Sequence, residues 1–375
     1  MKKILFITTR NPFSTRFSGD VIGSRKIINT LKKNNSLDVV SLGEKEDFSQ
    51  KNIFIFREPI KLLKLLYVIK SLIYMQPLQF GLFYSEEMKR FIIDRASDYD
   101  VIFCYHIRSI QYLPKHFYGK KIIEMGDLIS DNYKQTFYSL NILNPFKYIF
   151  FLESVFVKKI EKNILNNFDK IILFSKNEIK KIDKLFLKKI VHINVSIDKI
   201  KRKYFFSKDN SKILFIGNLK YLPNILAVKS FIIETLPNLR EKIPNIKFEV
   251  IGEISSFNKF LLSFYKSVKF RGVQTNLDKF IKGSICGLAN LKIATGIQGK
   301  ILTYMSYGLP VICSNKAAQN FDKNVISYKE NHDLINLIVK LKDNKKISNQ
   351  ISKKSIKFVK NYSWKKIGRQ YIKII

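Results

Sequence analysis

The sequence predicts an α/β protein made of two Rossmann-like halves. Short β-branched runs alternate with longer segments of helical periodicity, which is the pattern of βα units and a parallel sheet. A Lys-led apolar run starts the chain, and a second one, KILFI at residues 212–216, starts the series afresh. The length of 375 residues fits two domains at roughly 100 to 200 residues each.

Each half is expected to contain six strands, every one a short apolar run that ends in a loop. In the first half they cover residues 3–8, 37–41, 101–105, 121–124, 170–174 and 190–194. In the second half they cover residues 212–217, 247–252, 268–271, 285–289, 310–313 and 325–327. The boundary is expected in the polar, charged stretch 196–211, and the last segments, 345–360 and 363–375, are expected to be basic helices.

The net charge of +37 raises the question of a nucleic-acid partner. Of the 67 basic residues 56 are Lys and only 11 are Arg, whereas bidentate phosphate and base recognition favours Arg. Lys, Ile, Asn and Phe are abundant together, so part of the surplus is typical of compositional drift. An anionic membrane surface is the other natural partner for such a chain.

No stretch of the sequence is long and apolar enough for a membrane-spanning helix, and the start meets Arg10 where a signal peptide would be cleaved. The three cysteines are widely spaced and predict neither a disulfide framework nor a zinc site. A cytoplasmic protein is therefore expected. Segments 60–74 and 146–164 mix lysines with large apolar residues, as interfacial helices do, but Lys61 and Lys70 fall on opposite sides of the first helix. Helices that pack on the core and solvate their lysines are an equal alternative.

Residues 296–312, GIQGKILTYMSYGLPVI, carry the most informative motif. They predict a glycine loop, a short helix capped by Gly308, and a buried strand that Pro310 starts. A helix N-terminus behind a glycine loop offers free N–H groups and the positive end of the helix dipole, which suit a diphosphate. Lys300 would lie one turn into this helix. An ordinary βα connection is the plain alternative.

This segment resembles the donor-binding motif of family-four, or group 1, glycosyltransferases of the GT-B fold, in the subgroup with a G-I-Q-x-K loop. Further matches follow the family's order: FIGNLKYLPN at 215–224, FEVIG at 248–252, VKFRGV at 268–273 and YSW at 362–364. The implied fold is GT-B, two Rossmann-like domains facing each other across a cleft. The implied domains are 1–200 for the acceptor, 211–360 for the nucleotide-sugar, and 361–375 as a helix that crosses back to the first domain.

The resemblance implies a set of donor-binding residues in the second half. They are Gly217, Asn218, Lys220, Asn224, Glu253, Thr295, Gly296, Ile297, Gln298, Lys300 and Thr303. Thr295 and Thr303 stand where family members usually carry two Glu residues eight positions apart. A neutral hydroxyl makes a weaker hydrogen bond to a sugar than a carboxylate does, so the identity of the donor sugar stays open. Asn290 stands where a Pro is common.

In the first half the match is thinner. Gly19, Asp20 and Arg25 follow the first strand in a loop that in the family faces the acceptor, although Gly-Asp is also common turn chemistry. His106 follows the strand 101–105 and resembles the His that touches the donor sugar in retaining members, although a lone His at a strand end is often structural. Asp127 follows the next strand and is the spare candidate for a catalytic base, should the enzyme invert.

A metal is not expected. Asp98 and Asp100 match the D-x-D motif of metal-dependent glycosyltransferases, but they precede a strand, whereas metal ligands of that kind follow one. No His or Cys cluster offers another site. Positive dipole ends, Lys300 and Lys220 would instead stabilise the leaving diphosphate.

The expected function is transfer of a sugar from a UDP- or GDP-linked donor to a glycan or lipid-linked glycan of a bacterial surface polysaccharide, with retention. The acceptor class would be that of lipopolysaccharide O-antigen, capsule or exopolysaccharide, with no nucleic acid as partner. Two alternatives remain at this point. A nucleotide-sugar epimerase of the same fold would need catalytic carboxylates around the diphosphate site, and a non-enzymatic polyanion-binding protein would use the lysines alone.

Overall fold

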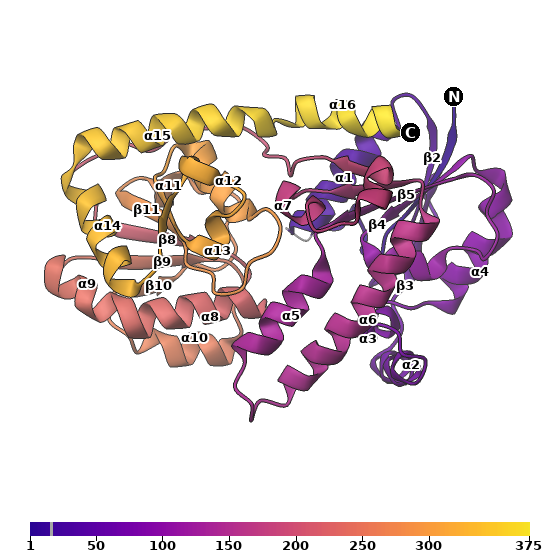
Figure 1. Ribbon diagram of the computed structural model, residues 1–375, viewed down its shortest axis with the longest axis horizontal. Coiled ribbons are helices and arrows are strands. Elements are labelled where there is room, and N and C mark those ends of the chain that lie inside the picture. The colour runs from indigo at the N-terminus through magenta and orange to yellow at the C-terminus, as the bar shows by residue number, and fades with distance from the viewer. Residues whose placement is uncertain (16–17) are drawn as a thin grey trace. The chain divides into compact units, whose positions relative to one another are not determined.

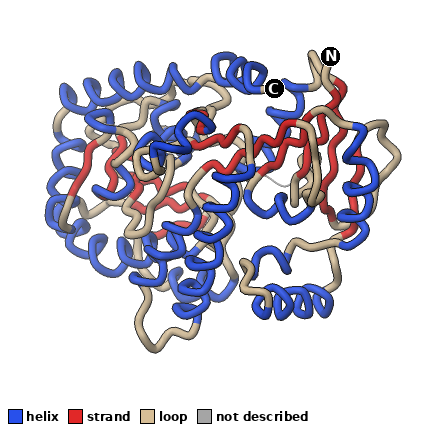
Figure 2. Tube along the Cα trace, turned by 45° about the vertical axis from the view of Figure 1, so that its right-hand side comes forward, coloured by secondary structure: helices blue, strands red, loops and turns tan. Residues whose placement is uncertain are grey.

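A computed structural model describes residues 1–15 and 18–375 of the chain (Figure 1). It divides into two compact units, Met1–Asn194 with Lys365–Ile375, and Val195–Trp364. We call these the first and the second unit. Within the described residues, each unit contains a parallel sheet, and in Figure 2 helices flank the strands of each sheet.

The first unit has a sheet of seven described strands in the order β3-β2-β1-β4-β5-β6-β7. The strands are β1 (Lys3–Ile7), β2 (Ser36–Gly43), β3 (Ile53–Arg57), β4 (Val101–Tyr105), β5 (Lys120–Gly126), β6 (Lys170–Leu173) and β7 (Ile190–His192). The helices are α1 (Gly19–Leu31), α2 (Lys61–Ile73), α3 (Leu78–Leu82), α4 (Glu86–Arg95), α5 (Ile129–Ser139), α6 (Phe146–Asn167), α7 (Lys176–Ile179) and α16 (Trp364–Ile374), with the short 3-10 helices η1 (Ala96–Asp98), η2 (Ile107–Tyr112) and η3 (Lys184–Lys189).

The second unit has a sheet of six described strands in the order β10-β9-β8-β11-β12-β13. The strands are β8 (Lys212–Ile216), β9 (Lys247–Ile251), β10 (Val268–Phe270), β11 (Ser284–Ala289), β12 (Val311–Ser314) and β13 (Ile326–Tyr328). The helices are α8 (Leu222–Ser230), α9 (Leu236–Lys242), α10 (Ser256–Ser263), α11 (Asp278–Ile281), α12 (Gly299–Tyr307), α13 (Asn315–Ala318), α14 (Asn331–Asp343) and α15 (Lys345–Val359), with η4 (Phe231–Thr235), η5 (Asp322–Asn324) and η6 (Lys360–Tyr362) between them.

Both sheets reverse their strand order beside the first strand of the unit. In the first sheet β1 lies between β2 and β4, and in the second β8 lies between β9 and β11. The second order is that of the dinucleotide-binding fold, in which ligands bind outside the carboxyl ends of the strands at this switch point. The α/β fold expected from the sequence is confirmed, and the switch points direct attention to the loops after these strands.

All twelve expected strands are present, and β3 is an additional one. The run Ile53-Phe54-Ile55-Phe56 pairs in parallel with β2 at the edge of the sheet, and the sequence analysis passed over it. The sequence does contain the pattern that predicts this strand, because four consecutive apolar residues that include β-branched ones are typical of a short strand.

The units divide a few residues away from the expected boundaries. Residues 195–204, expected in part as first-domain chain and linker, belong to the second unit. The Ile197 amide donates to the Tyr362 carbonyl and the Tyr204 amide to the Tyr307 carbonyl, which attach this segment to the second core. The last eleven residues belong to the first unit, where the Tyr371 hydroxyl donates to the buried carboxylate of Glu124.

No helix of the described residues meets the length and apolarity that a membrane span requires. Helix α2 nonetheless departs from one of the expectations for segment 60–74. Only Ser71 of this helix is buried, so it is not a core-packing helix. Helix α6 does pack on the core, through Phe156, Val157 and Ile164 in its later turns.

Candidate donor site and the polar cluster of the first unit

Two glycines bring the ends of β8 and β9 into close contact in the second unit. The Gly217 amide donates to the Ile251 carbonyl over 2.9 Å. Gly252 has a φ of +141°, and a Cβ at this position would lie 1.9 Å from the Gly217 carbonyl oxygen. A side chain cannot fit there, so glycine at 252 permits the two loops to meet at the switch point.

The loop after β8 presents polar groups at this junction. The Asn218 side chain accepts a hydrogen bond from the Lys220 amide at 2.8 Å, and the Asn224 side-chain amide donates to the Asn218 carbonyl at 2.8 Å. The Lys220 ammonium pairs with the carboxylate of Glu253, which follows β9. The structure therefore brings together five of the expected donor residues, Gly217 included.

Lys300 joins this group from the other side of the switch point. Its ammonium donates to Asn224 Oδ1 at 2.5 Å and lies 4.1 Å from the centroid of the buried Phe215 ring. No carboxylate of the described residues forms an ion pair with it. Burial lowers the pKa of this ammonium to about 7, because low-polarity surroundings disfavour the charged form. An anion placed here would supply the missing counter-charge.

The N-terminus of α12 lies directly beside Lys300 in the chain. Gln298 occupies the N-cap without capping the helix through its side chain, which instead donates to the Thr295 carbonyl at 2.8 Å. Gly296 has a φ of +59°, and a Cβ on Gly299 would meet no atom within 4 Å. Open space in front of uncapped N–H groups is the arrangement that phosphates occupy. The helix ends at Gly308, in the left-handed conformation expected of a Gly cap.

Of the two threonines that replace the usual Glu pair, Thr303 donates its hydroxyl to the Gly299 carbonyl one turn earlier at 3.0 Å. The oxygen keeps its acceptor capacity toward a sugar. Asn290 is buried after β11, where its side-chain amide donates to the Ala227 carbonyl at 2.8 Å. It holds α8 against the sheet, a role that the Pro common at this position could not perform through a side chain.

In the first unit, the expected acceptor residues hold the loop after β1. Arg10, three residues after this strand, pairs with Asp20 over 2.5 Å, and the Arg25 guanidinium donates to the carbonyls of Pro12 and Ser14 at 2.7 Å each. Burial would raise the pKa of the Asp20 carboxyl, but the nearby Ser18 hydroxyl and the Arg10 guanidinium outweigh it and keep that pKa below its usual value. Gly19 starts α1 in open space. A role in acceptor binding stays a prediction for all three.

His106 lies at the carboxyl end of β4. Its φ of +65° is unusual for a residue with a side chain, and its amide donates to the Glu124 carbonyl at 2.8 Å. Burial and the neighbouring Arg108 lower the pKa of the imidazole to about 4, so the ring is neutral at physiological pH. A backbone held in a sparsely populated conformation at a strand end is typical of a functional position.

Glu124 lies in β5 and Asp127 directly follows this strand, and both carboxyl groups are buried. Burial raises the pKa of Glu124 to about 8, although the hydrogen bond from Tyr371 opposes the shift, and burial raises that of Asp127 to about 7. Within the described chain, Asp127 Oδ1 is buried without a hydrogen-bond partner. A carboxyl group with a pKa near 7 and an unused oxygen fits a base or acid role, which stays a prediction for Asp127.

Three further residues lie beside Asp20, His106 and Glu124, and the sequence analysis did not identify them. They are Arg10, Arg108 and Tyr371. Each arginine lies three residues beyond the end of a strand, β1 or β4, and Arg is the rarer basic residue here. Position and rarity together could have indicated them. Tyr371 is 247 residues away from Glu124, and no local pattern connects the two. Among the described residues no group of three or more His, Cys, Asp and Glu side chains is placed to hold a metal ion.

Comparisons with known proteins show which family and which folds the chain resembles. Residues 210–353 match the family described as "Glycosyl transferases group 1". No curated protein matches the chain in sequence. Solved structures match its fold over nearly the whole length of the chain.

HepE of Anabaena, in complex with UDP and glucose, matches with a TM-score of 0.67 at 13% identity, over 100% of this chain and 99% of its own. A TarM variant of S. aureus, in complex with Fondaparinux, alpha-GlcNAc-glycerol and UDP, matches with a TM-score of 0.64 at 10% identity, over 100% and 99%. WaaG, a glycosyltransferase involved in lipopolysaccharide biosynthesis, matches with a TM-score of 0.66 at 11% identity, over 99% of both chains. Residues 210–353 are therefore similar to the group 1 glycosyltransferase family, and the chain as a whole has the GT-B fold.

Proposed function

We propose that the chain transfers a sugar, with retention, from a UDP- or GDP-linked donor to a glycan or lipid-linked glycan of a bacterial surface polysaccharide. The observation that carries the donor side is the Lys300 ammonium. It is held by Asn224 at the uncapped N-terminus of α12 and has no carboxylate partner among the described residues. The complexes of HepE and TarM with UDP support a uridine nucleotide as the first donor to test.

In this proposal the charge that grows on the leaving diphosphate is stabilised by groups already in place. The N–H groups at the start of α12 supply partial positive charge, and Lys300 supplies a full charge once an anion lies beside it. Lys220 adds a second ammonium when it exchanges Glu253 for a phosphate oxygen. We propose that no metal is needed, because these groups share the role that a divalent cation plays elsewhere.

Retention is supported by the resemblance of His106 to the residue that touches the donor sugar in retaining members. The neutral imidazole suits a hydrogen bond to a sugar hydroxyl. An inverting enzyme would need a base, and Asp127 is the residue that it would use. The anomeric configuration of the product, read by NMR, decides between the two outcomes.

The surface-polysaccharide assignment rests on the resemblance to group 1 glycosyltransferases rather than on a contact in the structure. WaaG supports it as a structural neighbour in lipopolysaccharide biosynthesis. Candidate donors incubated with membrane extract, followed by mass analysis of the product, test the acceptor class directly. A product that carries the sugar on a soluble metabolite would contradict the assignment.

We further propose that the first unit contacts an anionic membrane surface through α2. Five exposed apolar residues of this helix lie within an arc of about 100° at 100° per residue. They are Leu62, Leu65, Leu66, Ile69 and Ile73. Lys61 and Lys70 lie on either side of this apolar stripe. Their positions on opposite sides of the helix are therefore consistent with an apolar face that points outward between two lysines. Interfacial helices have this arrangement, and each lysine near an anionic surface contributes about 1 kcal/mol.

The opposite side of α2 packs on α3. Gly81 makes this possible, because a Cβ there would lie 2.4 Å from the Tyr67 backbone. The Lys64 ammonium is directed to Glu58 at 2.6 Å, on the protein side. The apolar stripe is thus held outward by the fold.

The donor site is tested by thermal shift with UDP, GDP and their sugars. Nucleotide should raise the melting temperature of the wild type, and Lys300→Ala should remove the shift. Lys292→Ala is the matched control, since Lys292 is an exposed lysine of the same unit that pairs with Glu234 at 3.7 Å. If no nucleotide raises the melting temperature, or if only heparin does so in a salt-sensitive way, the donor site is wrong.

The membrane contact is tested by flotation with vesicles of phosphatidylglycerol and phosphatidylcholine, and with phosphatidylcholine alone. Leu62→Ser with Ile69→Ser should release the protein from the anionic vesicles. Phe257→Ser with Leu261→Ser removes two exposed apolar residues of α10 in the second unit and should leave binding unchanged. Equal losses in both variants would mean that general surface hydrophobicity, and not α2, binds the vesicles.

A further inference from the structure

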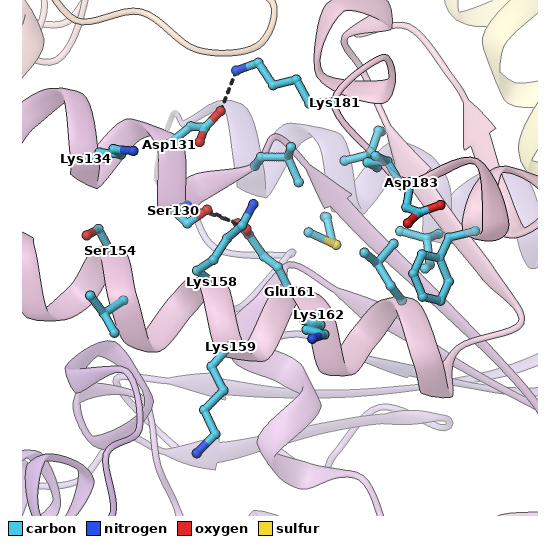
Figure 3. A pocket seen from close by; sticks show the side chains of 18 of the residues that line it. Ser130, Asp131, Lys134, Ser154, Lys158, Lys159, Glu161, Lys162, Lys181 and Asp183 are labelled. Atoms are coloured by element: carbon cyan, nitrogen blue, oxygen red, sulfur yellow. Dashed lines mark hydrogen bonds and ion pairs between the residues drawn. The ribbon is translucent and has the colours of Figure 1, made fainter.

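A cavity of about 940 Å³ lies in the first unit between α5, α6 and the segment of α7 and η3. Its volume falls in the range of about 300–1,000 Å³ that small-molecule sites occupy. Figure 1 shows α5 and α6 side by side, and Figure 3 shows the cavity from close by. Every residue that lines it belongs to the first unit, whereas the donor residues belong to the second.

The wall of the cavity is mostly apolar. Side chains from the ends of β5 and β6 and from the three flanking helical segments contribute to it. They include Met125, Leu128, Phe151, Leu165, Leu173 and Phe186. Phe151 and Val155 are about half exposed, at 47% and 48%, although both are large apolar residues in a folded unit. An apolar wall that faces a cavity is typical of a small-molecule site.

Lysines surround the apolar wall. Burial raises the pKa of the Glu161 carboxyl group, and Lys158 lies close enough to oppose that rise. Lys134, Lys158, Lys159 and Lys162 line the cavity, and none of them forms an ion pair with a described residue. Figure 3 shows Lys158 directed toward Ser130 and Glu161 and Lys159 directed away from them. Lys158 is therefore on the inner side of the cavity, where a bound anion can reach its ammonium group.

The acidic groups of the cavity are already engaged. Glu161 accepts hydrogen bonds from the Ser130 amide at 3.0 Å and the Ser130 hydroxyl at 2.5 Å. Asp131 pairs with Lys181 at 2.5 Å, and Asp183 accepts from the Leu185 amide at 3.0 Å. Five lysines and three acidic residues line the cavity, so its rim carries a net positive charge while its wall is apolar.

We propose that this cavity binds a single-chain lipid phosphate, with the hydrocarbon chain against the apolar wall and the phosphate among Lys134, Lys158 and Lys162. A free phosphate would leave the apolar wall exposed to water, and an uncharged chain would leave the lysines without a counter-charge. Only an amphipathic anion satisfies both parts of the cavity. The site goes beyond the proposed function, because binding here requires neither donor nor sugar transfer.

The test measures binding of three probes by isothermal titration calorimetry below their micelle concentrations. Dodecyl phosphate has both the chain and the charge, dodecanol has the chain alone, and inorganic phosphate has the charge alone. Dodecyl phosphate should bind at least tenfold more tightly than either of the others. Equal affinity for inorganic phosphate, equal affinity for dodecanol, or no binding of dodecyl phosphate would each overturn the proposal.

Variants locate the site. Lys158→Gln with Lys162→Gln should weaken dodecyl phosphate by about 30-fold, roughly fivefold for each lysine. Lys353→Gln with Lys357→Gln is the matched control, because these lysines are also exposed and four residues apart, on α15 of the second unit. An equal loss in the control would show a diffuse charge effect and would overturn the assignment to this cavity.

A second variant addresses the apolar wall at an exposed position, where the fold tolerates change. Val155→Glu places a negative charge beside the proposed phosphate and chain, and it should abolish binding while the melting temperature stays near that of the wild type. Unchanged binding in this variant would overturn the proposal. Failure of the donor assay leaves these measurements unaffected, since they contain no nucleotide.

Discussion

The pKa of Lys300 makes donor affinity depend on pH in a way that can be calculated. The ammonium has a pKa of about 7 in the free protein because it is buried beside Phe215 without a carboxylate. A diphosphate beside it favours the charged form, so binding requires the proton. A nucleotide-sugar is the suitable ligand, because its diphosphate is esterified at both ends and does not itself titrate in this range.

The magnitude follows from the fraction of charged Lys300 in the free protein. With a pKa of about 7, about nine-tenths of the molecules carry the charge at pH 6 and about 3% at pH 8.5. The affinity for UDP-glucose should therefore fall about 30-fold between these two values. At pH 7 each binding event should take up about half a proton, which calorimetry in buffers of different ionisation enthalpy measures directly.

Lys300→Arg and Lys220→Met serve as the comparison variants. Arg stays charged throughout, so its affinity should be flat from pH 6 to 8.5. Lys220→Met should weaken binding at every pH but keep the 30-fold fall. A wild-type affinity that is constant with pH, together with no proton uptake, would refute the assignment of Lys300 to the diphosphate.

Three further outcomes are expected. Gly299→Ala should leave the melting temperature unchanged or slightly raised, because its Cβ meets open space, but should weaken nucleotide binding, whereas Gly252→Ala should destabilise the second unit because its Cβ would meet the backbone at 1.9 Å. Glu124→Gln should reduce the decline of the free energy of unfolding with rising pH, measured by urea unfolding. The raised pKa of about 8 means that Glu124 lowers wild-type stability from pH 4.5 to 8, by up to about 1.4 kcal/mol per pH unit for one proton, and Asp127 should retain its own share of the decline. His106→Ala should lower kcat by the same factor at every pH between 5 and 8, because the wild-type imidazole is already neutral in this range. A wild-type pH profile of kcat with a step near pH 6.5 that disappears in the variant would contradict this.

Much of the second unit could be predicted from the sequence. The strands at 212–216 and 247–251, the glycine loop and the helix behind it were expected at these positions, because turn residues and apolar runs act over a few neighbours. The pairing of Lys220 with Glu253 and of Lys300 with Asn224 was not specified by any motif. These contacts join residues 33 and 76 positions apart, and their geometry depends on how the strands are ordered.

The first unit was predicted less fully for the same reason. Tyr371 reaches Glu124 across 247 residues, and the lysine-lined cavity joins segments from 125 to 186 that no single periodicity relates. Segment 60–74 shows the limit most clearly. Its apolar residues recur at helical spacing, which predicts one apolar face, but spacing does not say whether that face packs on the core or meets the solvent.

By itself the sequence determined that the chain is α/β and that it has two Rossmann-like halves, and it predicted a donor site at a glycine loop with a lysine. These conclusions rest on local chemistry, namely the alternation of β-branched runs with helical segments, the turn residues and the residues at helix termini. Only the tertiary structure decided which side of α2 faces outward and that lysines surround an apolar cavity. It also decided that no carboxylate of residues 1–15 and 18–375 forms an ion pair with Lys300, whose pKa lies near 7. Burial and counter-charge come from residues distant in the chain, and packing alone brings them together.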